Sequence, residues 1–378
     1  MKKWLAGPSA PLRPQAVWAL TLAALVFALT TSACRKAQVE SAPAPSSLAA
    51  TQISTVPPTR IRPIVLPADD APHPDATNEW WYHNGHLTAE SGAEYSFHYA
   101  VFAVTAPGQI QAVLAHAALT SHAGKTQSQA ERGRLGAVEP RPSGFHADVD
   151  GWLASGDGVR HILVFDVGQY HVELRVAVVK PPVLHKQSGW VQYPNGEVSA
   201  YYSRTLMAVS RQVGVSGVVQ SVGGAVWFDH QWGNFDARAA AWDWFALQLD
   251  AGPEVVLSLV RDASGAHVDM YGTYIAQDGA VRHLGANDFE VQRLATWTSP
   301  ASGAVYPMGW RVRLEDPPMD VMVVPLVESS EFDARRITGN FYWEGAVKVH
   351  GSHTGRGFVE MAGYAPRPPS ISPSQSRP

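Results

Sequence analysis

Aromatic side chains stand beside acidic ones in several short segments of this chain, and each segment has the spacing of a β-strand rather than of a helix. The densest is residues 224–234, Gly-Ala-Val-Trp-Phe-Asp-His-Gln-Trp-Gly-Asn. Side chains alternate across a strand, which predicts one face with Trp227, Asp229 and Gln231 and another with Phe228, His230 and Trp232. An Asp and a His in such surroundings need hydrogen-bond partners to offset the cost of desolvation. The segment is therefore either a polar contact that fixes the fold or a reactive site.

The rest of the folded region shows the same period. No stretch carries a sustained amphipathic helical pattern, and clusters of Gly, Pro, Asp or Asn separate most of the apolar runs. With 13 Trp, 32 Gly and 28 Pro, the composition also favours strands joined by turns. We predict an all-β fold with strands at 77–87, 94–104, 112–119, 161–167, 171–179, 200–208, 213–219, 254–260, 267–275, 310–314 and 319–326.

The strand pattern occurs twice. Residues 242–252 repeat the features of residues 77–87, an aromatic cluster with an acid, then Leu and a turn that contains Gly. Residues 342–351 likewise mirror 223–233 at the end of the first half. We interpret this as a tandem duplication, with an N-terminal domain over 71–237 and a C-terminal domain over 238–365. Strand units of this size close into barrels, which removes exposed sheet edges.

The first 34 residues have the features of a lipoprotein-type signal peptide. Lys2, Lys3 and Arg13 precede an apolar run over 16–29, and small residues then lead to Cys34. This pattern predicts lipidation of Cys34; the alternatives are an ordinary signal peptide cut nearby and an uncleaved anchor. Arg rather than Asp at position 35 resembles the sorting signal for the outer membrane, so we expect a lipid anchor facing the periplasm of a bacterial envelope.

The segments flanking the folded region have a different composition. Residues 35–70 are rich in Ala, Pro, Ser and Thr and are predicted to be a linker. Residues 366–378 are rich in Pro and Ser and are predicted to be a disordered tail.

Several function classes are disfavoured. The net charge is −4 and the folded region has no long run of Lys and Arg, so a nucleic-acid partner is not expected. A single cysteine excludes an intramolecular disulfide framework and any multi-thiolate metal site. The sequence shows no Gly-x-Ser-x-Gly elbow and no glycine-rich phosphate loop. His83 and His86 would face opposite sides of their strand, so we expect neither a metal nor another cofactor.

The order and spacing of the aromatic motifs resemble one known family. The motifs are Glu79-Trp80-Trp81-Tyr82, Tyr201-Tyr202-Ser203, Trp227-x-Asp229-His230-x-Trp232-Gly233, Trp242-Asp243-Trp244-Phe245, Tyr306-Pro307, Tyr342-Trp343-Glu344-Gly345 and Gly363-Tyr364. Together they resemble the AttH/carotenoid 1,2-hydratase-like family of lipocalin-like secreted proteins, over about residues 75–365. The resemblance implies two tandem lipocalin-like β-barrel or β-sandwich domains. It also implies an activity related to hydratases that add water to a double bond of a carotenoid or a prenylated compound.

The resemblance places a catalytic role on His230 and Trp232, and next on Asp229. Hydration of an isolated alkene needs an acid that protonates carbon, aromatic faces that stabilise the cation, and a water molecule. One position departs from the family, because Gln231 stands where Glu is common between the His and the Trp. The alternative interpretation is that Asp229 and His230 only join strand ends at the domain interface.

Further candidates for a ligand pocket are polar and aromatic residues near strand ends. They are Glu79, Trp81, Tyr82, Tyr202, Trp227, Asp243, Trp244, Trp343 and Glu344. Several of the acids can instead simply accept hydrogen bonds from neighbouring indole or backbone N–H groups. We expect an envelope lipoprotein that binds an apolar isoprenoid or lipid in a barrel cavity. It either hydrates or isomerises a double bond of that ligand, or only carries the ligand without catalysis.

Overall fold

The computed structural model describes residues 59–365, apart from 107–109, 194, 237–240 and 263. All regular structure in this part of the chain is β-strand, except for the short 3-10 helix η1 (Ala68–Asp70). The all-β prediction is therefore confirmed. No helix among these residues is long and apolar enough to cross a membrane. The predicted signal peptide, Cys34 and the tail 366–378 lie outside the described residues.

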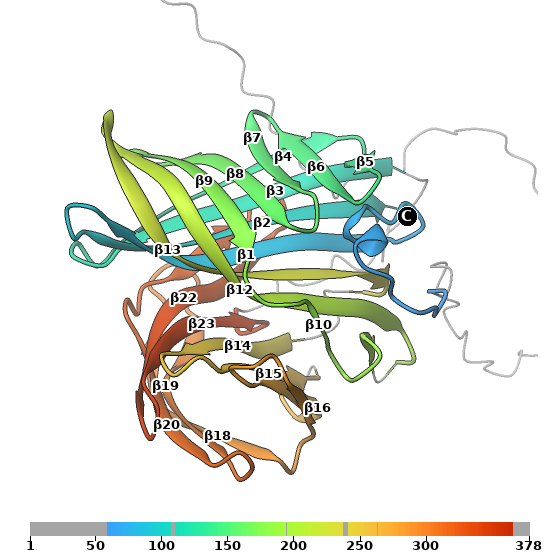
Figure 1. Cartoon of the computed structure of the whole chain (residues 1–378), viewed down its shortest axis with the longest axis vertical. Coiled ribbons are helices and arrows are strands. Elements are labelled where there is room, and N and C mark those ends of the chain that lie inside the picture. The colour runs from blue at the N-terminus through green and yellow to red at the C-terminus, as the bar shows by residue number, and fades with distance from the viewer. Residues whose placement is uncertain (1–58, 107–109, 194, 237–240, 263, 366–378) are drawn as a thin grey trace, which may run out of the picture. The chain divides into compact units, whose positions relative to one another are not determined.

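The first half of the chain forms a 13-stranded antiparallel sheet (Figure 1). Its main path runs β4-β3-β2-β1-β13-β12-β9-β8-β7-β6-β5, and β10 and β11 pair with β12. The strands are β1 (Asn78–Ala89), β2 (Glu94–Ala106), β3 (Ile110–Ser121), β4 (Thr126–Leu135), β5 (Glu139–Arg141), β6 (Gly144–Val149), β7 (Trp152–Gly156), β8 (Arg160–Val167), β9 (Tyr170–Val178), β10 (Val183–Leu184), β11 (Trp190–Gln192), β12 (Val198–Val215) and β13 (Val218–Asn234).

The second half forms a 10-stranded antiparallel sheet in the order β17-β16-β15-β14-β23-β22-β20-β19-β18, with β21 paired to β22. Its strands are β14 (Ala241–Leu249), β15 (Glu254–Arg261), β16 (His267–Ile275), β17 (Val281–Leu284), β18 (Phe289–Thr298), β19 (Val305–Leu314), β20 (Met319–Pro325), β21 (Glu331–Ala334), β22 (Asn340–Gly351) and β23 (Gly355–Ala362). In each sheet the last strand returns beside the first, β13 beside β1 and β23 beside β14.

This repeated topology of two curled sheets is the tandem lipocalin-like fold that we expected. The boundary predicted between residues 237 and 238 falls in the connection between the two sheets, after Asn234 and before Ala241. Each sheet encloses its own apolar core. Trp81, Phe97 and Phe228 are buried in the first core, and Phe245, Trp310 and Trp343 are buried in the second.

The second sheet covers part of the other face of the first sheet. Along β1, Trp81 and Leu87 point into the first core, whereas Tyr82 belongs to an apolar cluster shared with Trp244 and Phe358 of the second sheet. Hydrogen bonds cross the same interface. His86 Nε2 donates to the Gly357 carbonyl oxygen at 3.0 Å, and Tyr82 donates to Glu344. We call this interface between the sheets the seam.

Residues 59–77 lie against the first sheet before its first strand begins, and we call them the strap (Figure 1, blue). The Thr59 hydroxyl donates to the Val198 carbonyl oxygen at 3.1 Å, and the Trp190 indole donates to the Arg62 carbonyl oxygen at 2.8 Å. The Pro- and Ala-rich composition of residues 35–70 predicts that residues 59–70 belong to a linker. In the structure they are part of the folded body.

One predicted strand is wrong. The segment 213–219 is not a strand but contains the turn between β12 and β13. Val215 pairs with Val218, and the two residues between them, Ser216 and Gly217, have φ of 49° and 84°. Two central residues with positive φ form the tight hairpin turn that matches the twist of the flanking strands. The valines on both sides of the turn gave it the apparent period of a single strand.

Replacement of Gly357 by Ala tests the close pairing of β14 and β23 behind the seam. A Cβ at position 357 would overlap the carbonyl oxygen of Ala246 on the neighbouring strand. We expect Gly357→Ala to lower the free energy of unfolding by about 1–3 kcal/mol, as overpacked substitutions do. Gly223→Ala is the matched control, because its Cβ would come no closer than 3.9 Å to Val209. Equal urea midpoints for the two variants would contradict this packing.

Candidate functional site

Strand β13 carries polar residues on both of its faces, and the two sets lie in different places. The predicted alternation is confirmed: Phe228 and Trp232 belong to the first core, whereas Trp227 belongs to the seam. His230 lies on the core side and Asp229 on the seam side. The three residues predicted to be catalytic, Asp229, His230 and Trp232, therefore do not form one cluster.

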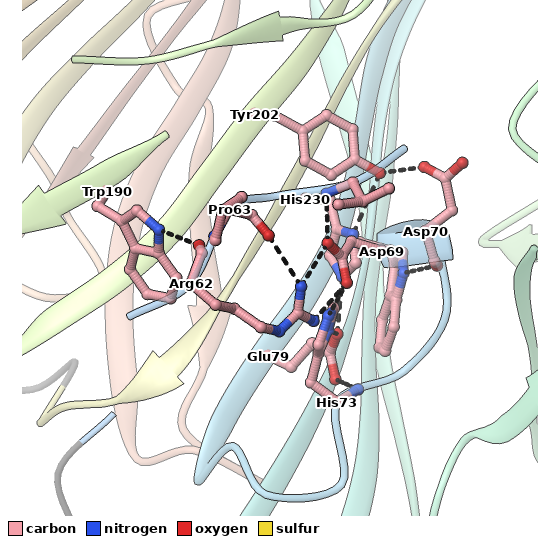
Figure 2. Close-up of polar contacts among 11 residues, drawn as sticks. Arg62, Pro63, Asp69, Asp70, His73, Glu79, Trp190, Tyr202 and His230 are labelled. Atoms are coloured by element: carbon pink, nitrogen blue, oxygen red, sulfur yellow. Dashed lines mark hydrogen bonds and ion pairs between the residues drawn. The ribbon is translucent and has the colours of Figure 1, made fainter. Parts of the chain in front are cut away.

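The core side of β13 meets β1 and the strap at Glu79. The Nε2 atom of His230 and the Nδ1 atom of His73 each lie 2.7 Å from Glu79 Oε1, and the backbone N–H of His73 donates to Glu79 Oε2 at 2.8 Å (Figure 2). Glu79 and His230 are buried, whereas the side chain of His73 is 14% exposed. The pairing of the two strands explains this contact. Glu79 on β1 lies opposite Trp232 on β13, and His230, two residues before Trp232, is on the same face of the strand.

A second layer of polar groups surrounds these three residues. The Tyr202 hydroxyl lies 3.2 Å from His230 Nδ1 and donates to the Asp70 carboxylate. Arg204 contacts both oxygens of Asp70, at 2.8 and 2.9 Å. Tyr202, Asp70 and Arg204 are all buried. We call the whole set His73, Glu79, His230, Asp69, Asp70, Tyr202, Arg62 and Arg204 the mouth cluster.

Asp69 ties the outer end of the mouth cluster together. Its Oδ2 accepts hydrogen bonds from Arg62 at 2.8 Å and from the Val65 amide at 2.6 Å, and its Oδ1 lies 3.3 Å from His73 Nε2. Burial by itself raises the pKa of Asp69, but the hydrogen bonds from Arg62, Val65 and His73 together outweigh it and lower the pKa to about 2. Asp69 is thus ionised at neutral pH.

Glu79 and His230 form a buried pair behind Asp69, and their contacts also set their protonation states. Burial raises the pKa of Glu79, but the hydrogen bonds from His230 and His73 outweigh burial, so the pKa lies below its usual value. Burial lowers the pKa of His230 more than its contact with Glu79 raises it. The arrangement at neutral pH is therefore a carboxylate facing a neutral imidazole.

Aromatic rings hold the two imidazoles in position. The His73 ring stacks on Trp232 with ring centres 3.9 Å apart and planes 4° from parallel. Trp81 stacks on His230 from the core side at 4.9 Å. Because the rings fix the orientation of the imidazoles, the nitrogen atoms are directed at their polar partners.

A cleft of about 770 Å³ opens beside this cluster. It is lined mainly by the strap, with His73, Asp69 and Arg62, and also by Trp232 and Trp190. This volume lies within the range of small-molecule sites. His73, Asp69 and Arg62 are thus the cluster members that reach a molecule in the cleft. Glu79 and His230 lie behind them.

Asp229 belongs instead to the seam. It accepts hydrogen bonds from the Trp227 indole at 2.7 Å, from the Tyr201 hydroxyl at 2.8 Å and from Ser203. The Trp244 indole, from the second sheet, donates to Tyr201 at 3.0 Å. Burial raises the pKa of Asp229 to about 6 in spite of its three donors. These contacts match the alternative interpretation, in which Asp229 joins strands at the domain interface.

Two glutamates lie deeper in the seam. Glu344 accepts a hydrogen bond from Tyr82, and Glu360, its partner on the neighbouring strand, accepts one from the Trp242 indole at 3.1 Å. Burial raises the pKa of Glu344 well above its usual value and that of Glu360 to about 7. The seam carboxyl groups therefore hold their protons to higher pH than an ordinary carboxyl group does, whereas Asp69 and Glu79 of the mouth cluster release theirs at lower pH.

The remaining candidates do not reach the cleft. Asp243 binds Arg261 at 3.0 Å and Arg293 at 2.8 Å in the second sheet. The Trp343 indole donates to the Glu328 carbonyl oxygen at 2.6 Å. Gln231, the departure from the family pattern, lies on the same face of β13 as Asp229. It donates to Tyr193 at 2.9 Å and to Ser199 at 2.8 Å. A glutamate in its place would also point away from His230.

Four residues of the mouth cluster, His73, Asp69, Asp70 and Arg62, are not among the site residues predicted from the sequence, and all of them lie in the strap. The available signal was the run Asp69-Asp70-Ala71-Pro72-His73, which places two acids and a histidine shortly before Glu79. Composition alone assigned this run to a linker and its end.

Comparisons with known proteins agree with the fold. The sequence model of a family described as AttH-like matches residues 57–364. A crystal structure described as an AttH protein from Nitrosomonas europaea is 26% identical, with a TM-score of 0.73, over 80% of this chain and 98% of that one. Kievitone hydratase from Nectria haematococca is 17% identical, with a TM-score of 0.60, over 79% of this chain and 93% of that one.

A third solved structure, CghA with Sch210972, is 12% identical, with a TM-score of 0.51, over 76% of this chain and 89% of that one. These last two likenesses concern the fold alone. No curated protein sequence matches the chain.

Replacement of Glu360 by Gln tests the protonated state of the seam. An unfolded glutamate ionises near about pH 4.3, whereas Glu360 in the folded protein has a pKa of about 7. Between these values the folded state holds a proton that the unfolded state has released, so stability falls as the pH rises. Glu360→Gln removes this loss.

The variant should therefore lose less stability than the wild type between about pH 5 and about pH 8, by on the order of 2 kcal/mol in urea unfolding. The control is Glu139→Gln at an exposed position, which should follow the wild type. An unchanged pH dependence in Glu360→Gln would show that the seam carboxyl group is already ionised.

Proposed function

The chain belongs to the AttH-like family, and from this premise we propose that it is a hydratase-like enzyme that adds water to a double bond of an apolar small molecule bound in the cleft at the mouth cluster. The observation that carries the proposal is the cleft itself, which ends on His73 while Glu79 holds that ring from behind. Binding an apolar ligand does not by itself require a buried set of charged groups, because burying such groups is costly. Their presence favours catalysis over simple carriage.

Each residue at the cleft has a separate role in the proposed reaction. His73 takes a proton from water, and the Glu79 carboxylate stabilises the positive charge that forms on the ring. The hydroxyl oxygen then forms a bond to one carbon of the double bond, and His73 returns the proton to the other carbon. Trp232 and Trp190 offer apolar faces to the ligand.

The charges of the cluster favour one kind of double bond. An isolated alkene needs a protonated acid of high strength, whereas the acids nearest the cleft are ionised and hydrogen-bonded to N–H donors. A base beside the cleft suits a double bond polarised by a carbonyl group or an aromatic ring, because water attacks its electron-poor carbon. We therefore propose an isoprenoid-like or lipid-like substrate with a conjugated double bond.

Substitution in the mouth cluster tests this function. The purified protein is incubated with a panel of conjugated and prenylated apolar alkenes in heavy-oxygen water, and hydrated products are identified by mass spectrometry. Glu79→Gln and His73→Ala should each lower kcat/KM by about 10²–10⁴-fold, the usual contribution of a general base. Both should still bind the substrate, because Trp232 and Trp190 still line the cleft.

The matched control is His171→Ala, since His171 is an exposed histidine of the same sheet that pairs with Asp166, outside the mouth cluster. Full activity in Glu79→Gln together with loss of activity in Asp229→Asn would move the reaction to the seam. Tight binding of an apolar ligand without turnover of any panel member would instead support the carrier.

We also propose that the chain is a lipoprotein, anchored through Cys34 at the periplasmic face of the bacterial outer membrane. Support comes from the basic start, the apolar run and the small residues before Cys34. The long Pro- and Ala-rich segment that follows would let the folded body reach apolar molecules near the membrane surface.

Lipid labelling tests the anchor. In cells fed a labelled fatty acid, the wild-type protein should carry the label and sediment with membranes. Cys34→Ser should lose both properties, because the acylated sulfur atom is absent. A wild-type protein that is unlabelled and soluble in the periplasm would show that an ordinary signal peptide is cut nearby.

A further inference from the structure

We propose that His73, Glu79 and His230 bind a divalent transition-metal ion, for which zinc is the best match. The inference deepens the proposed function, on which it rests only for what the ion does and not for whether the ion binds. Two imidazoles and one carboxylate are a donor set that zinc enzymes use, with a further position left for water.

The three donor atoms converge on one point. Each residue offers one donor atom, and these atoms all lie within 4.8 Å of one another. His73 Nδ1 and His230 Nε2 both face Glu79 Oε1 at 2.7 Å. They come from the strap, β1 and β13, so that the register of two paired strands and the hydrogen bonds of the strap hold them in place. The ligands thus approach one another before any ion is bound.

The hydrogen bonds around His230 favour an ion over a proton on Nε2. The Tyr202 hydroxyl donates to Asp70, so its oxygen faces His230 Nδ1 as an acceptor. A neutral imidazole has a single N–H. If the N–H is on Nε2 and donates to Glu79, Nδ1 carries no proton. The lone pair on Nδ1 then faces the Tyr202 oxygen, which is also an acceptor. With an ion on Nε2, the proton lies on Nδ1 and donates to Tyr202.

The contacts of His73 also favour an ion over a proton on the nitrogen that faces Glu79. Its Nδ1 faces Glu79 Oε1 at 2.7 Å and its Nε2 faces Asp69 Oδ1 at 3.3 Å, so both neighbours are carboxylates. A neutral ring can satisfy only one of them. An ion on Nδ1 places the proton on Nε2, where Asp69 accepts it. Metal-binding histidines usually donate their other N–H to a carboxylate or a similar acceptor.

The charge of the cluster points the same way. Arg62 pairs with Asp69 and Arg204 pairs with Asp70, whereas the side-chain partners of Glu79 are the two histidines. These three carboxylates and two guanidinium groups leave one negative charge when the imidazoles are neutral. A divalent cation would compensate this charge at the buried Glu79, where an unpaired charge is most costly.

Other histidines of the described chain lack this arrangement. His83 and His161 contact each other at 2.8 Å, and His116 approaches Glu131 at 3.8 Å. Within residues 59–365, apart from the gaps in the description, His73, Glu79 and His230 form the one group of three with converging donors. The site also borders the cleft through His73, which leaves a path for the ion and for water.

A bound ion would change the first step of the proposed reaction. Zinc lowers the pKa of a bound water molecule to near neutrality, so the ion rather than His73 would generate the hydroxide that attacks the double bond. Because the ion would occupy His73 Nδ1, the proton lost by the bound water would pass to solvent in the cleft, and the other carbon of the double bond would take its proton from solvent.

Zinc binding to the full-length protein provides the test. After dialysis against a chelator, zinc chloride is titrated into the protein in a calorimeter, and the zinc content is measured by mass spectrometry. We expect one zinc ion per chain. His73→Ala and Glu79→Gln should weaken binding by more than about 100-fold. Asp69→Asn keeps all three proposed ligands but weakens the acceptor of His73 Nε2, and should weaken binding by about 10–100-fold. His171→Ala should bind as the wild type does.

Cobalt(II) provides a readout that needs no variant. Cobalt should give the visible absorption bands of a low-coordinate site with nitrogen and oxygen ligands, and zinc should remove them. Absence of stoichiometric zinc and of these bands in the wild-type protein would overturn the proposal, and would mean that protons on both imidazoles satisfy the contacts.

The proposed function fails separately. Zinc binding without hydration of any alkene would leave the metal site in place and remove the activity. Hydration that continues in chelator-treated, zinc-free protein would leave the proposed activity in place and show that the ion takes no part in it.

Discussion

The carboxylate of Glu79 holds together the part of the structure on which any activity at the cleft depends. One of its oxygens faces His73 and His230, and the other accepts the backbone N–H of His73. These contacts join the strap to β1 and β13, three elements that meet only because the sheet curls and returns on itself. A buried carboxylate without such partners would be strongly destabilising, so the site and the closure of the strap over the sheet depend on each other.

The two faces of β13 separate two kinds of polar chemistry. On the core side, N–H donors and guanidinium groups keep Asp69 and Glu79 ionised beside the cleft. On the seam side, burial raises the pKa of Asp229 to about 6 and that of Glu360 to about 7, and Tyr and Trp side chains satisfy these carboxyl groups. The first set suits proton exchange with a ligand. The second joins the two sheets through hydrogen bonds from Tyr and Trp side chains, which satisfy carboxyl groups in an aromatic setting.

Local patterns in the sequence were sufficient for the fold and for half of the site. Alternation over 224–234 correctly placed Asp229 and His230 on opposite faces, and repeated aromatic segments indicated two similar sheets. The hairpin at Ser216-Gly217 was missed because valines flank the turn on both sides. The strap was missed for a different reason. Its Pro-rich composition resembles a linker, and its histidine acquires a role only through Glu79 and through His230, which lies far along the chain. Such long-range contacts have no local signature in the sequence.

The central claim is that a small molecule binds at the mouth cluster and not between the sheets. Crystals of the protein soaked with a set of small apolar alkenes and aromatic fragments would test this claim directly by electron density. We expect fragments in the cleft between the strap and Trp232, in contact with the His73 ring. Fragments that instead separate Tyr82, Trp227 and Trp244 in the seam, with an empty cleft, would contradict it.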